Sequence, residues 1–351
     1  MANLASLKDF QPSLQMLSIV SDLAEFKGAW RSLSNIPPDR LARLKKVATM
    51  ESIGSSTRIE GSSLSDEQVE KLLCGLDRSF VSRDEEEVAG YADAIEIVFE
   101  SWAIVPISEN HIKQMHSILL KHSEKDARHR GKYKTVANNV EAFDENGNSI
   151  GVIFKTVSPF DTPFRMTELI EWTNLAFEEG HLHPLIIVAV FVVVFLSIHA
   201  FQDGNGRLSR ILTTLLLLKS GYSYAQYSSL ESVIEASREH YYLSLRKTQQ
   251  TLDNQLPDWE SWIMYFLRSM QLQKNRLQQK LEKSKLIESD LPTLSVKIIE
   301  LIVEHGSIKT SALEVLTQEN RSTLKLRLNE LISKGKIARH GRGRATWYTL
   351  P

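Results

Sequence analysis

The pattern of hydrophobic and polar positions predicts a chain built mainly from helices. The strongest signal is residues 185–198 (LIIVAVFVVVFLSI), which are almost wholly apolar. These fourteen residues fall short of the ~20 that a membrane-spanning helix needs, so we interpret them as a buried core helix. A second apolar run, residues 211–218 (ILTTLLLL), follows after a short polar loop. Because that loop joins two buried segments, we expect it to be rigid.

Apolar residues recur at helical spacing along most of the remaining chain. The stretch up to about Pro38 is mixed in pattern and predicts no particular element. Ser65 and Gln68 have the spacing of a capping box, and Asp258 is placed to cap a long helix. Further helices are predicted over residues 40–59, 65–73, 84–102, 108–122, 164–177, 231–248 and 259–285.

Residues 131–157 break the helical pattern. Strand-like residues flank the segment ENGN at 145–148, and Asn-Gly is a strong local signal for a β-hairpin. The sequence therefore predicts two short antiparallel strands here.

The C-terminal residues predict a separate module. Helices are expected at 295–304, 309–316 and 320–333, followed by strands at 336–339 and 345–350 around an HGRGR turn. This is the element order of a winged helix-turn-helix. Its basic side chains could bind DNA phosphates. The open alternative is that the module mediates protein interaction or dimerisation. These side chains are Arg321, Lys325 and Arg327 on the third helix and Arg339, Arg342 and Arg344 on the wing.

Composition narrows the class of protein. With 42% hydrophobic and 24% charged residues, the chain has the make-up of a soluble globular protein. The single Cys74 excludes an internal disulfide framework, and the N-terminus lacks a basic flank followed by an apolar run, so we expect a cytoplasmic protein without membrane partners. The net charge is −1, but residues 292–351 carry +5 and the remainder −6, which suggests a different partner for the C-terminal module.

The chemistry concentrates in the loop HAFQDGNGRLSR, which begins at His199 and ends at Arg210. Two glycines flank Asn205, so the backbone can turn tightly and present bare N–H groups at the start of the next helix, where phosphate oxygens bind well. Arg207 and Arg210 share one helix face and can hold further phosphate oxygens. The loop therefore predicts a triphosphate site.

Two residues of the loop supply the remaining chemistry. Asp203 offers a hard oxygen ligand of the kind that Mg²⁺ accepts alongside phosphate oxygens. His199 can take a proton from an attacking hydroxyl at neutral pH, since an unperturbed histidine has a pKa of about 6.5. His111, His116 and His122 are interpreted as core or surface residues, because no zinc-binding pattern contains them.

The loop resembles the pattern H-x-F-x-D/E-G-N-G-R-x-x-R of the Fic family at every specified position, with Ala200 where most members have proline. The resemblance implies transfer of AMP from ATP to a Ser, Thr or Tyr hydroxyl of a target protein. It also implies that His199 is the base, that Asp203 binds Mg²⁺ and that Phe201 points into the core. The implied phosphate contacts are Gly204, Asn205 and Gly206 as an anion hole, Arg207 and Arg210.

A second segment resembles the inhibitory motif S/T-x-x-x-E-G/N of Fic proteins in which a regulatory helix precedes the core. It consists of Ser56, Glu60 and Gly61. A carboxylate delivered to Arg210 would form a bidentate pair with the guanidinium that the γ-phosphate needs. The alternative is that Glu60 is a solvated carboxylate at a helix end.

Two further features take a role from the resemblance. Tyr241 and Tyr242 match an aromatic position near the adenine, although tyrosines on helices are usually core residues. The predicted hairpin matches the family's flap, and the resemblance implies that it holds the target segment beside the active site by strand addition. An ordinary surface hairpin is the alternative.

Together these features predict a mainly α protein: a Fic-type helical core with a small β-hairpin flap and a C-terminal winged helix-turn-helix. The expected division is a helical region with the inhibitory motif at 1–105, a catalytic core at 106–290 and a winged helix at 291–351. The expected activity is Mg²⁺-dependent protein adenylylation restrained by Glu60. Two alternatives stay open: a Fic enzyme that removes AMP or transfers another phosphate group, and a DNA-binding regulator whose core senses nucleotide. A homodimer is also left open.

Overall fold

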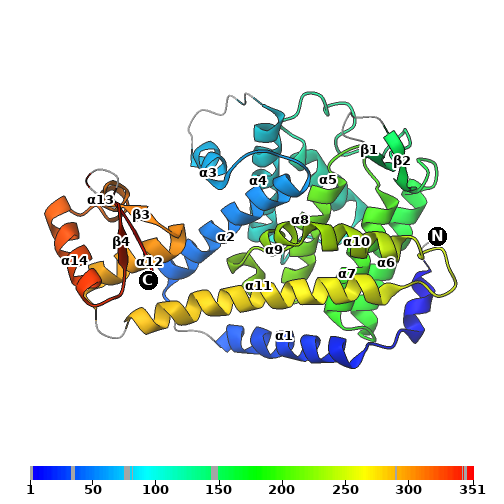
Figure 1. The fold of residues 1–351 in the computed structure, drawn as a ribbon. Coiled ribbons are helices and arrows are strands. Elements are labelled where there is room, and N and C mark those ends of the chain that lie inside the picture. The colour runs from blue at the N-terminus through cyan, green and yellow to red at the C-terminus, as the bar shows by residue number, and fades with distance from the viewer. Residues whose placement is uncertain are drawn as a thin grey trace. The chain divides into compact units, whose positions relative to one another are not determined.

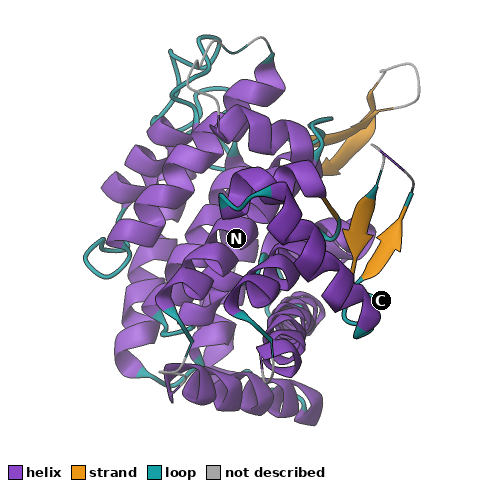
Figure 2. Ribbon diagram, turned by 90° about the vertical axis from the view of Figure 1, so that its left-hand side faces the viewer, coloured by secondary structure: helices purple, strands orange, loops and turns teal. Residues whose placement is uncertain are grey.

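The computed structural model describes residues 3–32, 36–74, 80, 82–143, 149–288, 291–341, 343 and 346–351. The chain forms two compact units, one of Met1–Ile36 with Ala48–Lys274 and one of Pro37–Val47 with Asn275–Pro351. Helices make up most of both units, and the strands are confined to two small sheets (Figures 1 and 2). The mainly α fold class that the sequence predicts is confirmed.

The described elements of the first unit follow one another as short and medium-length helices, interrupted by a single hairpin. They are η1 (Leu4–Asp9), α1 (Leu14–Ser32), the second part of α2 (Pro38–Ile59), α3 (Asp66–Cys74), α4 (Arg83–Ser101), α5 (Glu109–Leu119), β1 (Val140–Phe143), β2 (Ser149–Phe154), α6 (Thr162–Glu179), α7 (Pro184–Ile198), α8 (Asn205–Lys219), η2 (Ser223–Tyr227), α9 (Leu230–Ala236), α10 (Arg238–Gln249) and the first part of α11 (Trp259–Glu288).

Helix α7 is the centre of the first unit. It is apolar all round, and every residue from Leu185 to Ile198 except Ser197 is buried. Helices α6, α8 and α10 pack against it, and the indole Nε1 of Trp262 donates a hydrogen bond of 2.7 Å to the carbonyl of Ala189. Burial of each large aliphatic side chain here stabilises the folded state by about 1.5–3 kcal/mol. A helix fixed this firmly gives the loop at its C-terminal end a rigid base.

Local capping explains several helix starts. Ser65 and Gln68 form the predicted capping box, with bonds of 2.9 and 3.3 Å, and Asp258 accepts from the amide of Ser261 at 3.1 Å at the start of α11.

Among the described helices, none is both long and apolar enough to cross a bilayer. Helix α1 has no counterpart in the sequence interpretation, because only a narrow stripe of apolar residues marks its packed face: Met16, Ile19 and Leu23.

Strands β1 and β2 pair antiparallel, with Val140 opposite Phe154 and Phe143 opposite Ser149. A hairpin is therefore present where the Asn-Gly signal predicts one. The turn itself, residues 144–148, lies outside the described residues.

The second unit has a core of its own, made by α12 (Thr293–His305), α13 (Thr310–Thr317), α14 (Arg321–Ser333) and a three-stranded antiparallel sheet. The strands β3 (Ile308–Lys309), β4 (Ala338–His340) and β5 (Trp347–Thr349) lie in the order β3-β5-β4. This topology has the predicted element order of a winged helix-turn-helix, with β3 added. Two residues are too few to give a strand signal in sequence. Arg342 and Arg344 of the wing lie outside the described residues.

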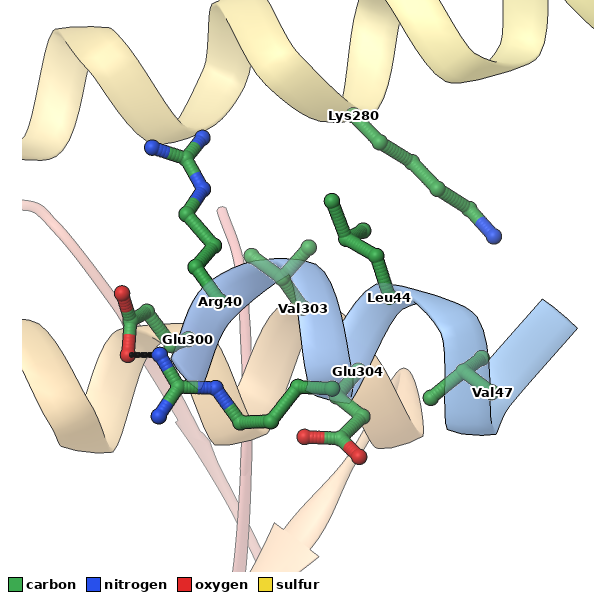
Figure 3. A pocket seen from close by; sticks show the side chains of 8 residues that line it. Arg40, Leu44, Val47, Lys280, Glu300, Val303 and Glu304 are labelled. Atoms are coloured by element: carbon green, nitrogen blue, oxygen red, sulfur yellow. Dashed lines mark hydrogen bonds and ion pairs between the residues drawn. The ribbon is translucent and has the colours of Figure 1, made fainter. Parts of the chain in front are cut away.

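The first turns of α2 belong to this second unit, where Arg43 is ion-paired with Glu300 and Arg40 donates to the carbonyl of Leu281 at 3.4 Å. Figure 3 shows the side chains around a cavity of about 50 Å³ in this region. A cavity of that size has room for little more than a water molecule. The contacts thus group residues 37–47 with the C-terminal module, whereas the sequence division places them in the N-terminal region. That three-part division stays a prediction.

Candidate active site

His199 lies at the point where α7 ends. Its backbone is left-handed (φ 52°, ψ 56°), and its N–H donates to the carbonyl of Phe195 at 3.0 Å. The ring Nδ1 is 3.3 Å from the carbonyl of Leu196, which favours the tautomer with the proton on Nδ1. Burial lowers the pKa of His199, although that carbonyl and the carboxylates of Glu60 and Asp203 oppose the shift. The imidazole is therefore neutral at pH 7, and the lone pair of its Nε2 can accept a proton.

A buried amide closes the loop after His199. The Asn205 side chain accepts from the N–H of Phe201 at 2.9 Å and donates to the carbonyl of the same residue at 2.6 Å. Gly204 is the left-handed N-cap of α8 (φ 75°), and the helix begins at Asn205. The first amides of a helix have no intrahelical partner. The side chain of Asn205 is thus occupied, and only its backbone N–H is available to a ligand. The backbone N–H groups of Gly206 and Arg207 are available beside it.

Phe201 and His116 fix the loop on its buried side. Phe201 is fully buried, as predicted, and its ring stacks on the imidazole of His116 with centroids 3.9 Å apart. The Nδ1 of His116 accepts from Gly131 N–H at 2.8 Å, so its Nε2 donates to the carbonyl of Asp203 at 2.9 Å. Burial lowers the pKa of His116 to about 4, which keeps it neutral. His116 is a core residue, and the described residues include no cluster of three or more metal-ligating side chains.

The carboxylate of Asp203 faces a polar cavity of about 320 Å³. It accepts from the N–H of Gly204 at 2.5 Å and from Arg207 at 3.4 Å, and it is ion-paired with Arg83. Burial acts to raise the pKa of Asp203, but Arg207, the Gly204 amide and Arg83 outweigh it and lower the pKa. Asp203 is therefore ionised and held among cations.

Arg207 is buried below the same cavity. Its Nη1 lies 3.0 Å from a carboxylate oxygen of Glu87, and Glu87 in turn pairs with Arg83 at 2.9 Å. Neither Arg83 nor Glu87 was identified from the sequence. Both lie at the start of α4. The helix dipole adequately explains acidic residues there but not Arg83, and no local spacing marks either residue as part of a site.

Arg210 receives the predicted inhibitory segment. Its Nε donates to the Ser56 hydroxyl at 2.7 Å, and its Nη2 donates to the Ser56 carbonyl at 2.9 Å and to a carboxylate oxygen of Glu60 at 2.7 Å. Gly61, two residues after the end of α2, has a positive φ of 107°. The structure therefore brings the remote motif onto Arg210, but through one oxygen of Glu60 and not through the expected bidentate pair, because Nε of the guanidinium is bonded to Ser56.

The Glu60 carboxylate also covers the glycine turn. A Cβ atom added to Gly206 would lie 2.0 Å from Oε1 of Glu60, so only glycine allows this approach. Two buried donors beside it, Nη1 of Arg210 and Nε of Arg207, have no hydrogen-bond partner in the described part of the chain. Unsatisfied guanidinium N–H groups of this kind fit an anionic ligand.

A second, mostly apolar cleft of about 680 Å³ adjoins the polar cavity and shares Glu60, His199 and Gly206 with it. Tyr241 and Tyr242 both line this cleft. Tyr241 is buried, whereas Tyr242 is 43% exposed and donates from its hydroxyl to the carbonyl of Ile59 at 3.3 Å. The site thus has an apolar half and a charged half that meet at His199.

Residues 106–217 match the Fic/DOC family model. This part of the chain is a Fic domain. The matched range contains the whole loop from His199 to Arg210, whereas Glu60 and the two tyrosines lie outside it.

Solved structures of Fic proteins share the fold. A Fic family protein from Desulfovibrio desulfuricans has a TM-score of 0.63 at 20% identity, and the alignment covers 97% of each chain. A Fic domain containing signaling protein from Bacteroides thetaiotaomicron has a TM-score of 0.59 at 24% identity, covering 74% of this chain and 97% of that one. Fic-1 from C. elegans has a TM-score of 0.58 at 21% identity, covering 75% and 71%.

Sequence relatives match over short segments. The protein adenylyltransferase Fic of Drosophila willistoni is 38% identical over 64 residues, which is 18% of this chain and 13% of the relative. A probable protein adenylyltransferase of Aquifex aeolicus is 29% identical over 89 residues, which is 25% of this chain and 27% of the relative. The chain thus matches well under a third of the length of either named adenylyltransferase.

Proposed function

We propose that this protein is an adenylyltransferase, which transfers AMP from ATP to a hydroxyl group of a target protein. The observation that carries the proposal is the meeting of a neutral His199 with the N-terminus of α8 and two buried arginines. A base beside an anion-binding helix end is the arrangement that nucleotidyl transfer needs. The names of the matched relatives support the same chemistry.

In this mechanism Nε2 of His199 takes the proton of the target hydroxyl. The hydroxyl oxygen then bonds to the α-phosphorus of ATP, the bond from that phosphorus to the bridging oxygen breaks, and pyrophosphate leaves. The N–H groups of Asn205, Gly206 and Arg207 stabilise phosphate oxygens at the start of α8. The unsatisfied donors of Arg207 and Arg210 would contact the β- and γ-phosphates.

The two halves of the site fit the two halves of ATP. The apolar cleft of about 680 Å³ has room for an adenine ring, and Tyr242 is exposed enough to contact it. The polar cavity of about 320 Å³ is lined by Arg83, Asp203 and Arg207. Charge and polarity therefore favour one orientation, with the phosphates beneath His199.

Asp203 fits the role of a magnesium ligand. Its carboxylate is ionised, faces the polar cavity and already has two arginines around it, so the local charge balance accommodates a cation in place of one of them. Mg²⁺, when bound, would neutralise part of the phosphate charge.

Glu60 restrains the reaction in this proposal. Its carboxylate bonds to Arg210 and fills the space against Gly206, which are the two features that would receive the outermost phosphate. ATP could then bind only in a pose unsuited to in-line attack. Release of Glu60 from Arg210 would activate the enzyme.

Mass spectrometry of protein targets tests the activity. A cell lysate is incubated with ATP and with Glu60→Gly, with Glu60→Gly/His199→Ala or with buffer alone. We expect the mass of one AMP on Ser, Thr or Tyr residues with Glu60→Gly and a loss of roughly 100-fold or more without His199. A different added mass would indicate another transferred group, and equal labelling by both variants would exclude His199 as the base. Loss of AMP from a previously modified target would favour the reverse reaction.

A further inference from the structure

A short segment just before the hairpin holds four consecutive carbonyl groups, those of the last residue of α7 and of the first three residues of the loop that follows it. The ammonium of Lys134 donates to Ile198 O at 3.0 Å, and the backbone N–H of Lys134 donates to Ala200 O at 2.9 Å. The side-chain amide of Asn138 donates to His199 O at 3.2 Å and to Phe201 O at 2.7 Å. These contacts surround His199 on both sides, and neither Lys134 nor Asn138 was identified from the sequence.

Lys134 is an unusual residue to find in this position. It is 3% exposed, and its three ammonium bonds go to neutral oxygens: Ile198 O, Asn138 Oδ1 at 2.7 Å and Thr156 Oγ1 at 2.9 Å. Burial lowers the pKa of Lys134 to about 8, so the amine is largely protonated at neutral pH. Removing a cation from water is costly without a carboxylate partner. Packing alone would be served better by an apolar side chain, so the charge points to a role in the site.

The backbone that the segment holds is a strained one. His199 is one of two described non-glycine residues with positive φ, and such a conformation costs of the order of 1 kcal/mol or more. Four hydrogen bonds to the surrounding carbonyls offset that cost. The direction of the imidazole follows from this backbone conformation, because the side chain leaves the chain at the same residue.

The same side chains close the base of the hairpin. Thr156, two residues after β2, donates from its hydroxyl to Asn138 Oδ1 at 3.1 Å, and its N–H donates to Asn139 Oδ1 at 3.1 Å. Asn138 and Asn139 directly precede β1. One network therefore joins both ends of the hairpin to the carbonyls around His199.

We propose that Lys134 and Asn138 are positioning residues for the transfer reaction: they fix the backbone at His199 and set its register against the hairpin. The inference rests on the proposed function and on the expectation that the hairpin acts as the flap that holds the target segment beside the base. In this arrangement one shared set of hydrogen bonds positions the hydroxyl group of the target protein relative to Nε2 of His199. The proposed phosphate contacts come from the backbone N–H groups and arginines at the start of α8 and not from Lys134 or Asn138.

The charge of Lys134 has a second consequence for His199. After burial, it is the main group that lowers the pKa of the imidazole, against the Leu196 carbonyl, Glu60 and Asp203. The buried cation therefore adds to the effect of burial in favouring the neutral form of the base.

Kinetics of matched variants test the proposal. In the Glu60→Gly background, Lys134→Met is expected to lower kcat for target adenylylation roughly 100-fold, because small misplacements of a catalytic group have effects of that size. KM for ATP should change less than about threefold, since the phosphate contacts come from α8. Lys134→Arg should restore part of kcat, and the exposed Lys132→Met should match the background. An unchanged kcat, or a loss that appears only in KM for ATP, would overturn the proposal.

A spectroscopic measurement keeps the proposal separate from the activity. The ¹⁵N shifts of the His199 ring in Glu60→Gly should show the tautomer protonated on Nδ1, and Lys134→Met should shift the ring toward a mixture. Asn138→Ala provides a second variant with the same expectation, should Lys134→Met fail to fold. Unchanged shifts in a folded variant would refute the positioning role. Absence of any AMP transfer by Glu60→Gly, with shifts that do change, would refute the proposed function alone.

Discussion

The loop after α7 and the surface of α14 both carry arginines, but these arginines differ in burial and in the sequence distance to the carboxylates that they pair with. Arg207 and Arg210 have side chains only 3% exposed and pair with Glu87 and Glu60, which lie far from them in sequence, although Arg207 also contacts Asp203 four residues before it. Arg321 and Arg327 have side chains 67% and 29% exposed and pair with carboxylates close to them in sequence, Arg327 with Glu330 one turn away.

The difference indicates which charged side chains have a role other than stabilising the folded chain. Exposed ion pairs contribute about 0–1 kcal/mol, and solvent screens them. Buried guanidinium groups incur a desolvation cost that their pairing only partly offsets, and some of their donors remain unsatisfied among the described residues. We infer that the α7–α8 loop is built for an anionic ligand. Arg327 on α14 also has a buried Nε without a hydrogen-bond partner among the described residues, but its side chain is 29% exposed and its guanidinium is paired with a carboxylate of its own helix.

The largest effect that would distinguish the two regions is expected from Arg210. In the Glu60→Gly background, Arg210→Ala should reduce AMP transfer roughly 100- to 1,000-fold, because it removes a charged donor aimed at the phosphates. Transfer of labelled AMP to a target protein measures the loss. Arg210→Lys should recover only part of the rate, since lysine lacks the planar fork. Full activity of Arg210→Ala would contradict the assignment of a phosphate contact.

A smaller effect is expected from Arg83, whose side chain is 44% exposed and which competes for Asp203. In the same background, Arg83→Ala should free the carboxylate and tighten binding of Mg²⁺ with ATP by about three- to tenfold, in line with a partly exposed ion pair. Calorimetric titration measures the affinity, and Arg83→Lys should resemble the parent. Weaker binding would show instead that Arg83 itself contacts the nucleotide.

Sequence and structure agree best where the chemistry is contiguous. His199, Asp203 and Arg210 lie within twelve residues, so their spacing alone marked the loop, and Glu60 was reached through a second motif. Asn205 was assigned to the anion hole, but its side chain is used to close the loop on Phe201. Such a role depends on a turn whose shape the spacing does not reveal.

The supporting residues could not be found in this way. His116, Lys134 and Asn138 reach the loop from positions more than sixty residues earlier, and their local patterns are those of an ordinary helix or hairpin entry. The contacts depend on how α5 and the hairpin return to α7. The fold class followed from periodicity, because long apolar and amphipathic helices are visible in any one segment.

The smallest effects are expected on α14. Arg321→Ala and Arg327→Ala together should change the free energy of unfolding by no more than about 1 kcal/mol and leave AMP transfer in Glu60→Gly unchanged. Chemical denaturation and the labelling assay measure these quantities. A gel shift at several salt concentrations shows whether the pair binds DNA, since phosphate contacts impose a steep salt dependence. Loss of AMP transfer would make the C-terminal unit part of the catalytic machinery and remove the contrast.

The rate of AMP transfer by the wild-type protein and by Glu60→Gly, at saturating ATP and with one purified target, tests the central claim most directly. The contacts of Glu60 with Arg210 and Gly206 predict a rate roughly 10- to 100-fold higher for the variant, which corresponds to the loss of one charge-assisted hydrogen bond. Glu60→Gln should lie between the two. Equal rates, or a slower variant, would contradict the claim that Glu60 holds the site closed.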